Sequence, residues 1–267
     1  MASEPQAQLP LFYKDLMPLN NRDHATWRAR AVDKAAWLGN QHAIPLTVEE
    51  FPHAQRNFPI VFSAGDNPVP LALMGLNEGV NVFFEEDGAP RGEAYIPAYI
   101  RRYPFLLAKL RPDADEMSLC FDPTSDILGD FKDGEALFED GQPSAHTKGV
   151  LDFCEKFEEA GARTQAFVEE LKSADLLMDG EVAIQQNDKP DQPYIYRGFK
   201  MVNQEKLKEL NTKKLKAWHE NGILPLVYTH LLSLDLMRFI FAKQTEQGKG
   251  PGAATATAAE TASATVN

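Results

Sequence analysis

Two adjacent arginines, Arg101 and Arg102, stand inside a segment that is otherwise mostly apolar, YIPAYIRRYPFLL from Tyr95 to Leu107. A guanidinium group can hold a carboxylate or a phosphate through two parallel hydrogen bonds. An apolar segment tends to be buried, and a buried guanidinium requires an acidic partner. The two arginines therefore meet either a carboxylate of the protein itself or an acidic ligand, and the sequence leaves both possibilities open.

Each possibility involves different neighbours. If the pair is structural, one arginine forms a salt bridge with a glutamate and the other lies on the surface. If the pair is functional, one guanidinium holds the ligand and tyrosines of the segment form an aromatic wall. The candidate glutamates are Glu49, Glu50 and Glu93, the candidate wall residues are Tyr95, Tyr99 and Tyr103, and Glu50 is also a candidate residue of the ligand site.

Arg197 and His230 are two further candidates for the ligand site. Arg197, in YRGF, follows a segment of alternating tyrosines, so it either binds the ligand or forms a salt bridge across a strand pair. His230, in VYTHLLSL, lies on an apolar helical face. It is either a core histidine with satisfied hydrogen bonds or, if close to Arg101, a general acid or base.

The common catalytic and nucleotide-binding motifs are absent from the sequence. There is no G-x-G-x-x-G, Walker A, G-x-S-x-G or H-E-x-x-H pattern. This argues against a Rossmann or P-loop enzyme. The six histidines show no ligand-like spacing, so we predict no metal site, and no motif implies a cofactor.

Composition limits the partners. Asp and Glu outnumber Lys and Arg by 39 to 27, which gives a formal charge of -12 and argues against binding to nucleic acid or anionic lipid. Cys120 and Cys154 stand among apolar residues and are expected to be buried free thiols. We expect no signal peptide, because the N-terminus has no basic region followed by an apolar run. We expect no membrane insertion, because the longest apolar run, Ile223 to Ala242, is interrupted by polar residues. The expected location is therefore the cytoplasm.

Strands are predicted early in the chain. Three β-type runs separated by turn residues indicate an antiparallel meander, and a fourth run follows the arginine segment, where a short helix from Pro97 is expected to end before Pro104. The acidic, turn-rich stretch Asp122–Gln142 reads as a surface loop. The four runs are Phe58–Ala64, Val69–Leu76, Val80–Glu86 and Met117–Asp122.

Helices are predicted later. Apolar residues at three- and four-residue spacing predict a long helix from about Ser144 to Ala174, with Ser144 as its N-cap and Gly161 as the place of a close helix crossing. A hairpin with a turn at NDKPDQP follows. The hairpin strands are Glu181–Gln185 and Tyr194–Val202, and the C-terminal helices are Asn203–Leu210, Thr212–Asn221 and Leu224–Thr245.

This order of elements predicts the α+β class, with an antiparallel sheet of meander and hairpin packed against the long helix and the C-terminal helices. One domain is expected over residues 9–246. The first eight residues are expected to be flexible. Residues 247–267, rich in Ala and Thr, lack the apolar residues needed for a packed core and are expected to be disordered.

Several motifs in order resemble the SapC-like family, which is named after a component of a bacterial surface-layer locus. The similarity extends from Leu9 to Phe241. It is carried by LFY and PLN within LFYKDLMPLN, by EFP and PIVF, by P-x-ALMGL, by YIPAYIRRYPF, by ART-x-AFV, by RGF and by L-x-YTHLLSL.

The resemblance implies a soluble bacterial protein that supports the production or export of surface proteins. Similar proteins tend to be encoded beside TonB-dependent outer-membrane receptors and flavin-dependent halogenase-like genes. It implies no reaction and no catalytic residues. The leading hypothesis is a binding protein for a peptide, a protein segment or an acidic ligand near Arg101 and Arg102. The alternatives are an enzyme of unrecognised type, such as a metal-dependent oxygenase, and a structural subunit with a broad apolar surface.

Overall fold

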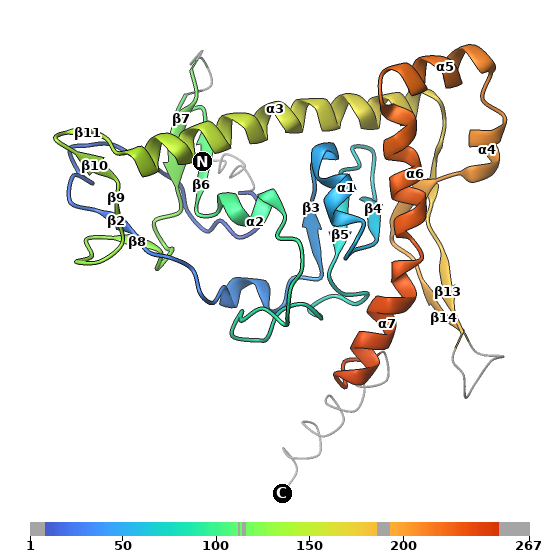
Figure 1. The fold of residues 1–267 in the computed structure, drawn as a ribbon, viewed down its shortest axis with the longest axis horizontal. Coiled ribbons are helices and arrows are strands. Elements are labelled where there is room, and N and C mark those ends of the chain that lie inside the picture. Colours follow the sequence, from blue (N-terminus) through green and yellow to red (C-terminus); the bar gives the residue numbers. More distant parts are fainter. Residues whose placement is uncertain (1–8, 112, 114–115, 186–192, 251–267) are drawn as a thin grey trace, which may run out of the picture. The chain divides into compact units, whose positions relative to one another are not determined.

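The computed structural model describes residues 9–111, 113, 116–185 and 193–250 (Figure 1). The chain divides into two compact units. Each unit has its own buried apolar cluster. The prediction that residues 9–246 form a single domain stays a prediction. The first unit contains Met1–Asp33 and Ala98–Glu159, and the second contains Lys34–Pro97 and Ala160–Asn267.

An antiparallel five-stranded sheet lies at the centre of the second unit, in the order β12-β15-β4-β5-β3. Three consecutive residues of β4, Ile60, Val61 and Phe62, are fully buried, so both faces of this central strand are covered. The strands are β3 (Ala43–Pro45), β4 (Ile60–Ser63), β5 (Pro70–Leu73), β12 (Leu177–Asp179) and β15 (Phe199–Val202).

Two of the three strands predicted for the meander are confirmed. The runs Phe58–Ala64 and Val69–Leu76 contain β4 and β5, which pair with each other. The third run, Val80–Glu86, is not a strand, and this prediction is wrong. Apart from one isolated bridge at Phe84, this run has no regular secondary structure and is bent at Val82 and Phe83. The second neighbour of β5 is instead β3.

A buried asparagine explains why the third run turns. The side-chain oxygen of Asn81 accepts hydrogen bonds from the backbone N–H groups of Phe83 (2.8 Å) and Phe84 (3.1 Å). Its amide nitrogen donates to the carbonyl oxygens of Leu38 (3.0 Å) and Gln41 (2.9 Å). Bonds of this kind compete with the backbone ladder of a strand. The apolar run is therefore buried without joining the sheet.

The predicted hairpin is confirmed in part, because β13 (Val182–Ile184) pairs antiparallel with β14 (Tyr194–Tyr196). The predicted second strand, Tyr194–Val202, is two strands, and its later part, β15, pairs with β12 and β4 instead. Apart from Pro193, the predicted turn at residues 187–193 lies outside the described residues. The helix predicted over Leu224–Thr245 is present as two successive helices, α6 and α7. The helices of the second unit are η1 (Ala36–Leu38), η2 (Val48–Glu50), α1 (Phe51–Ala54), α4 (Gln204–Lys208), α5 (Thr212–Glu220), α6 (Ile223–Ser233) and α7 (Leu236–Glu246).

Helices α6 and α7 form a stretch, residues 223–246, that is long and apolar enough to cross a membrane by length and composition alone. This is weak evidence, since core helices of other proteins pass the same test. Only 33% of its most apolar window is buried. The buried residues Val227, His230 and Ser233 face the sheet, where α6 packs against β4 and β15.

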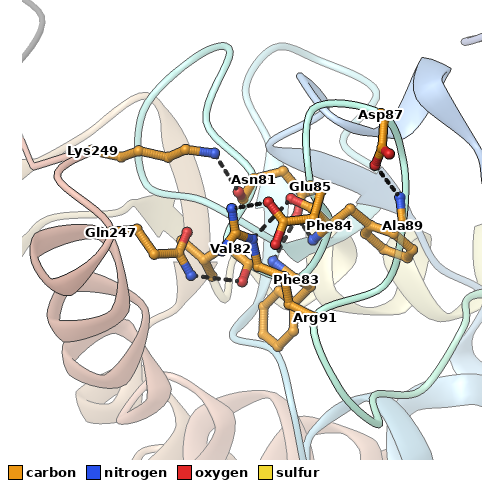
Figure 2. A network of polar contacts seen from close by, with 10 residues as sticks. All are labelled: Asn81, Val82, Phe83, Phe84, Glu85, Asp87, Ala89, Arg91, Gln247 and Lys249. Atoms are coloured by element: carbon orange, nitrogen blue, oxygen red, sulfur yellow. Dashed lines mark hydrogen bonds and ion pairs between the residues drawn. The ribbon is translucent and has the colours of Figure 1, made fainter.

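The chain after α7 is held by the loop around Asn81 (Figure 2). Lys249 Nζ donates to the carbonyl oxygen of Asn81 (3.3 Å), and Gln247 Nε2 donates to that of Val82 (3.1 Å). In the same loop Arg91 forms a salt bridge with Glu85. Of the tail predicted to be disordered from residue 247, residues 251–267 lie outside the described part of the chain.

The first unit contains two small antiparallel sheets, in the orders β1-β7-β6 and β8-β2-β9, and the hairpin β10–β11. The strand predicted over Met117–Asp122 is confirmed as β7. The surface loop predicted over Asp122–Gln142 is wrong, because the stretch contains strands and buries Ile127, Leu128 and Leu137. The strands are β1 (Met17–Pro18), β2 (Arg28–Ala29), β6 (Phe105–Ala108), β7 (Ser118–Phe121), β8 (Leu128–Gly129), β9 (Glu135–Ala136), β10 (Phe138–Glu139) and β11 (Gln142–Pro143).

Two helices place the arginines and the residues opposite them. The short helix α2 (Ala98–Arg102) carries both arginines and ends before Pro104, as predicted. The long helix α3 (Ala145–Ser173) confirms the predicted helix. The close crossing expected at Gly161 is wrong, since no described heavy atom lies within 4 Å of the position that a Cβ would take there. With antiparallel sheets beside these helices, the α+β class is confirmed.

Candidate functional site

The eight residues predicted for the ligand site belong to two different units. Four of them, Arg101, Arg102, Tyr99 and Tyr103, are in the first unit, on and directly after α2. The other four are in the second unit. They are Glu50, Tyr95, Arg197 and His230.

Arg102 is a buried cation surrounded by aromatic rings. Its side chain is only 7% exposed, and its Nη1 lies 3.5 Å from Oε1 of Glu158 on α3. The guanidinium carbon lies 4.3 Å from the ring centroid of Phe157 and 4.6 Å from that of Tyr99. These contacts offset part of the cost of burying the charge. The acid that meets Arg102 is therefore Glu158, not one of the glutamates predicted from the sequence.

The tyrosines nearest to Arg102 point their hydroxyl groups at backbone oxygens. Tyr13 donates to the carbonyl oxygen of Phe105 (2.6 Å), and Tyr99 donates to that of Leu11 (3.2 Å). Burial raises the pKa of Tyr13, Tyr99 and Tyr103. Tyr103 packs edge-on against Tyr13 at a centroid distance of 5.3 Å. Around Arg102 these rings act as packing partners.

A pocket of about 430 Å³ lies between α2, β6 and the beginning of α3, and both arginines line it. Its polar side chains are those of Arg101, Arg102 and His146. Arg101 also lies over the ring of Phe153, with its guanidinium carbon 5.2 Å from the ring centroid. The remaining lining residues are apolar or small: Phe105, Ala145, Gly149, Val150 and Phe153.

The first turn of α3 is fixed in place by its cap. The hydroxyl oxygen of Ser144 accepts a hydrogen bond from the backbone N–H of Thr147 (3.2 Å), as expected for an N-cap, and donates to the carbonyl oxygen of Ala136 (2.6 Å). The hydroxyl of Thr147 donates to the carbonyl oxygen of Leu137 (2.7 Å). His146 is therefore held at the positive end of a helix of 29 residues.

Two nitrogen atoms of the pocket residues are covered by protein and lack a hydrogen-bond partner among the described residues. They are Nε of Arg102 and Nε2 of His146. A buried polar atom without a partner costs about 1–3 kcal/mol. The guanidinium groups of Arg101 and Arg102 give the pocket positive charge, and the two unpartnered nitrogens give it unused hydrogen-bonding capacity. Such an arrangement favours an acceptor with negative charge.

Glu50 and Tyr95 contact each other in the second unit. The Glu50 carboxylate accepts hydrogen bonds from the backbone N–H and the hydroxyl of Thr47 at 2.9 Å, which closes a capping box at the start of η2. It also accepts a hydrogen bond from the hydroxyl of Tyr95 (3.0 Å). The neighbouring Glu49 pairs with Arg163. These two glutamates connect η2 to Tyr95 and Arg163.

His230 is a core histidine. It is fully buried, its Nδ1 lies 2.8 Å from the carbonyl oxygen of Ile60, and its Nε2 accepts a hydrogen bond from the N–H of Val202 (3.1 Å). Burial lowers its pKa to about 4, so the ring is neutral at pH 7, with the proton on Nδ1. Both nitrogens are used in joining α6 to β4 and β15.

Arg197 forms a salt bridge across the hairpin. Its Nη2 lies 2.6 Å from Oε2 of Glu181, and both side chains are exposed. Tyr194 and Tyr196 pack against Phe241 of α7. Arg197 thus forms a salt bridge across a strand pair, which is the structural one of the two alternatives that the sequence left open.

Among the described residues, no group of three His, Cys, Asp or Glu side chains is placed to hold a metal ion. Both cysteines are buried free thiols, as predicted. Burial raises the pKa of the Cys120 thiol and raises that of Cys154 to about 11, which disfavours a reactive thiolate in either position.

Comparison with protein families gives a match to the SapC family model over residues 19–239. The chain belongs to the SapC family. The matched range includes α2, β6 and all of α3, so every pocket residue of this SapC protein lies inside the family region. No curated protein and no solved structure matches the chain.

Sequence reasoning missed two residues of this SapC site, His146 and Glu158. Neither belongs to a motif, and both are far from Arg102 along the chain. The only signal near His146 is the predicted N-cap at Ser144, which indicates that the histidine stands in the first turn of a helix. Glu158 lies on the same helix, with no local feature that sets it apart from the other glutamates of α3.

Proposed function

We propose that this SapC family member is a binding protein that holds an organic anion in the pocket of Arg101, Arg102 and His146. The observation that carries the proposal is a guanidinium buried beside a pocket, with an Nε–H that lacks an acceptor among the described residues, next to a histidine nitrogen in the same condition. A ligand oxygen would supply the missing partner. Charge-assisted hydrogen bonds are stronger than neutral ones.

A carboxylate fits this pocket better than a phosphate dianion. Glu158 already neutralises part of the charge on Arg102 and occupies its Nη1. The donors that line the pocket are then the guanidinium of Arg101, one N–H of Arg102 and the His146 ring. This small set of donors suits a group of one negative charge with two oxygens. Because Nε of Arg102 and Nε2 of His146 are both covered, both side chains have to shift for a ligand oxygen to reach these atoms.

The apolar lining points to a ligand with an apolar group beside its carboxylate. The lining includes two aromatic rings and one branched side chain, those of Phe105, Phe153 and Val150. Gly149 has no side chain, and no described heavy atom lies within 4 Å of the position that a Cβ would take there. A volume of about 430 Å³ is within the range of small-ligand pockets. The C-terminal residue of a peptide has the required chemistry, a carboxylate next to an apolar side chain.

The resemblance to the SapC-like family supports a cellular setting for this binding activity. We propose that the protein acts in the cytoplasm as an accessory to surface-layer or outer-membrane uptake systems, where it would bind a segment of a client protein or a small acidic ligand. The metal-dependent enzyme has no support from the described residues, because none of their acidic, histidine or cysteine side chains form a ligand set.

Calorimetric titration with two matched probes tests the proposal. N-acetylphenylalanine carries a carboxylate beside a benzyl group, whereas N-acetylphenylalaninamide is the same molecule without the charge. We expect the acid to bind at least about tenfold more tightly than the amide, since a charged hydrogen bond contributes about 1.5–3 kcal/mol. Equal affinity for both, or no binding of either, would contradict an anion site. Tighter binding of inorganic phosphate would contradict the choice of a carboxylate.

A further inference from the structure

The outward side of α6 and α7 is apolar and exposed. Tyr228, Leu232 and Phe239 are 51%, 68% and 45% exposed, and they lie at spacings of four and seven residues, on one side of the helical stretch. The backbone of Leu234 and Asp235, which join the two helices, is itself helical (φ -62°, ψ -27° and φ -60°, ψ -25°). We call the set Tyr228, Leu232, Asp235, Leu236, Arg238 and Phe239 the α6–α7 face.

The α6–α7 face carries one acid and one base at its middle. Asp235 and Arg238 lie on the same flank of the stripe, one turn apart, and Arg238 is exposed. Within the described part of the chain, neither side chain forms a salt bridge. Exposed apolar surface of this kind marks an interaction site in a protein. The charges restrict what can cover it.

A bilayer is a poor occupant for this face. Two ionised groups halfway along the stripe would have to enter the lipid, which costs several kcal/mol. The formal charge of -12 also opposes approach to anionic lipid. A protein surface that places a base opposite Asp235 and an acid opposite Arg238 pairs both charged groups without moving them into lipid. A second copy of the same face, turned antiparallel, presents its own charges in that order.

We propose that the α6–α7 face binds the α6–α7 face of a second copy, with the helices antiparallel around a twofold axis close to Leu236. In this arrangement Leu232 of each copy lies against Phe239 of the other. Asp235 of each copy meets Arg238 of the other, because a twofold axis between antiparallel helices brings equal flanks together. The two salt bridges are identical, and no two like charges are opposed.

The α6–α7 face is small for a dimer interface. A stretch of 24 residues spans about 36 Å at 1.5 Å per residue. A single pair of helices of this length buries less than the roughly 1,600 Å² of a standard interface, which is typical of weak association. We therefore expect a dissociation constant on the order of micromolar or weaker. Association would then depend on protein concentration in the range used for sedimentation.

Sedimentation equilibrium of the full chain with Leu232→Glu is the first test. We expect dimerisation to weaken at least about tenfold, because a charge replaces the most exposed apolar side chain of the face. Val69→Glu is the matched control, since Val69 is 47% exposed but lies outside the face, and it should dimerise like the wild type. Circular dichroism of both variants checks that they are folded.

A charge-exchange experiment tests the antiparallel pairing itself. Asp235→Lys and Arg238→Glu should each weaken dimerisation, because each places like charges opposite one another. In an equimolar mixture of the two variants, the introduced lysine of one chain opposes the introduced glutamate of the other. The unchanged Arg238 and Asp235 also meet, so dimers should form again as heterodimers. Two separately weakened variants that stay monomeric when mixed would overturn the arrangement.

Two results would overturn the proposal as a whole. One is a wild-type chain that stays monomeric up to about 1 mM, far above the expected dissociation constant. The other is a monomer that floats with vesicles of phosphatidylcholine and phosphatidylglycerol, and loses this binding in Leu232→Glu. The second result would assign the face to a membrane.

Discussion

Nη1 of Arg102 lies 3.5 Å from Oε1 of Glu158, so the buried guanidinium of α2 is fixed by a carboxylate on α3. The same guanidinium packs against the rings of Tyr99 and Phe157. One side of Arg102 is thus committed to the fold of the first unit. Its Nε has no hydrogen-bond partner among the described residues, and the residue lines the pocket.

Arg102 should therefore matter for stability and Arg101 much less. Arg102→Met retains an unbranched side chain but loses the contacts with Glu158 and the aromatic rings, and we expect a loss of about 2 kcal/mol in the free energy of unfolding. Arg101 is exposed, and Arg101→Met should cost less than about 1 kcal/mol. Urea denaturation measures both. Equal losses would show that the two arginines do not have different roles.

The neutral state of His230 makes stability depend on pH. The folded-state pKa of about 4 lies below the ordinary value of 6.5, so only the unfolded chain takes up a proton as the pH falls from 6.5 to 4. The stability contribution is complete above pH 6.5, and about 3 kcal/mol should be lost by pH 4. His230→Gln should remove this part of the pH dependence. An unchanged slope in the variant would assign it to other groups.

Asn81 should be among the most sensitive positions of the loop shown in Figure 2. Asn81→Asp retains the acceptor for Phe83 but cannot donate to Leu38 and Gln41, and it buries a charge. We expect a loss of about 3 kcal/mol in the free energy of unfolding. Asp87→Asn, at an exposed side chain in the same loop, should change it by less than about 1 kcal/mol. Comparable losses in both variants would contradict the role given to the Asn81 amide.

Neither cysteine should react while the protein is folded. Cys120 and Cys154 are 0% and 2% exposed, and burial raises the pKa of both thiols. With a thiol-specific disulfide reagent at pH 8, we expect no fast reaction in buffer, whereas both thiols should react in urea. A thiol that reacts quickly in buffer would indicate an accessible, activated cysteine.

The sequence predicted elements whose signal is local. The helix after Ser144 has apolar residues at helical spacing and an N-cap, and both features depend only on neighbours within a few residues. The strand predicted over Val80–Glu86 failed for a different reason. Its apolar residues are mostly buried, but the Asn81 side chain bonds to distant and local backbone groups, and burial alone does not reveal that.

The residues of the candidate site, like the secondary-structure elements, were predictable only in part. Two charges in an apolar segment singled out Arg101 and Arg102, and both line a pocket in the structure. His146 and Glu158 come to Arg102 only through the packing of α3 in the first unit. No spacing along the chain encodes such a contact. Arg197 and His230 looked similar to site residues because exposed salt bridges and buried histidines use the same residue types as binding sites.

Blocking the pocket without altering its charges tests the central claim most directly. Gly149 lines the pocket, and no described heavy atom lies within 4 Å of the position that a Cβ would take. Gly149→Phe would fill the pocket, whereas Gly149→Ala leaves it open and should favour the helix by roughly 0.5–1 kcal/mol.

The decisive measurement is calorimetric titration of both Gly149 variants with N-acetylphenylalanine. The account predicts wild-type affinity in Gly149→Ala and at least about a tenfold loss in Gly149→Phe, with Arg101 and His146 unchanged in both proteins. Circular dichroism and urea denaturation show whether Gly149→Phe is folded. Undiminished binding to a folded Gly149→Phe variant would contradict the assignment of the anion site to this pocket.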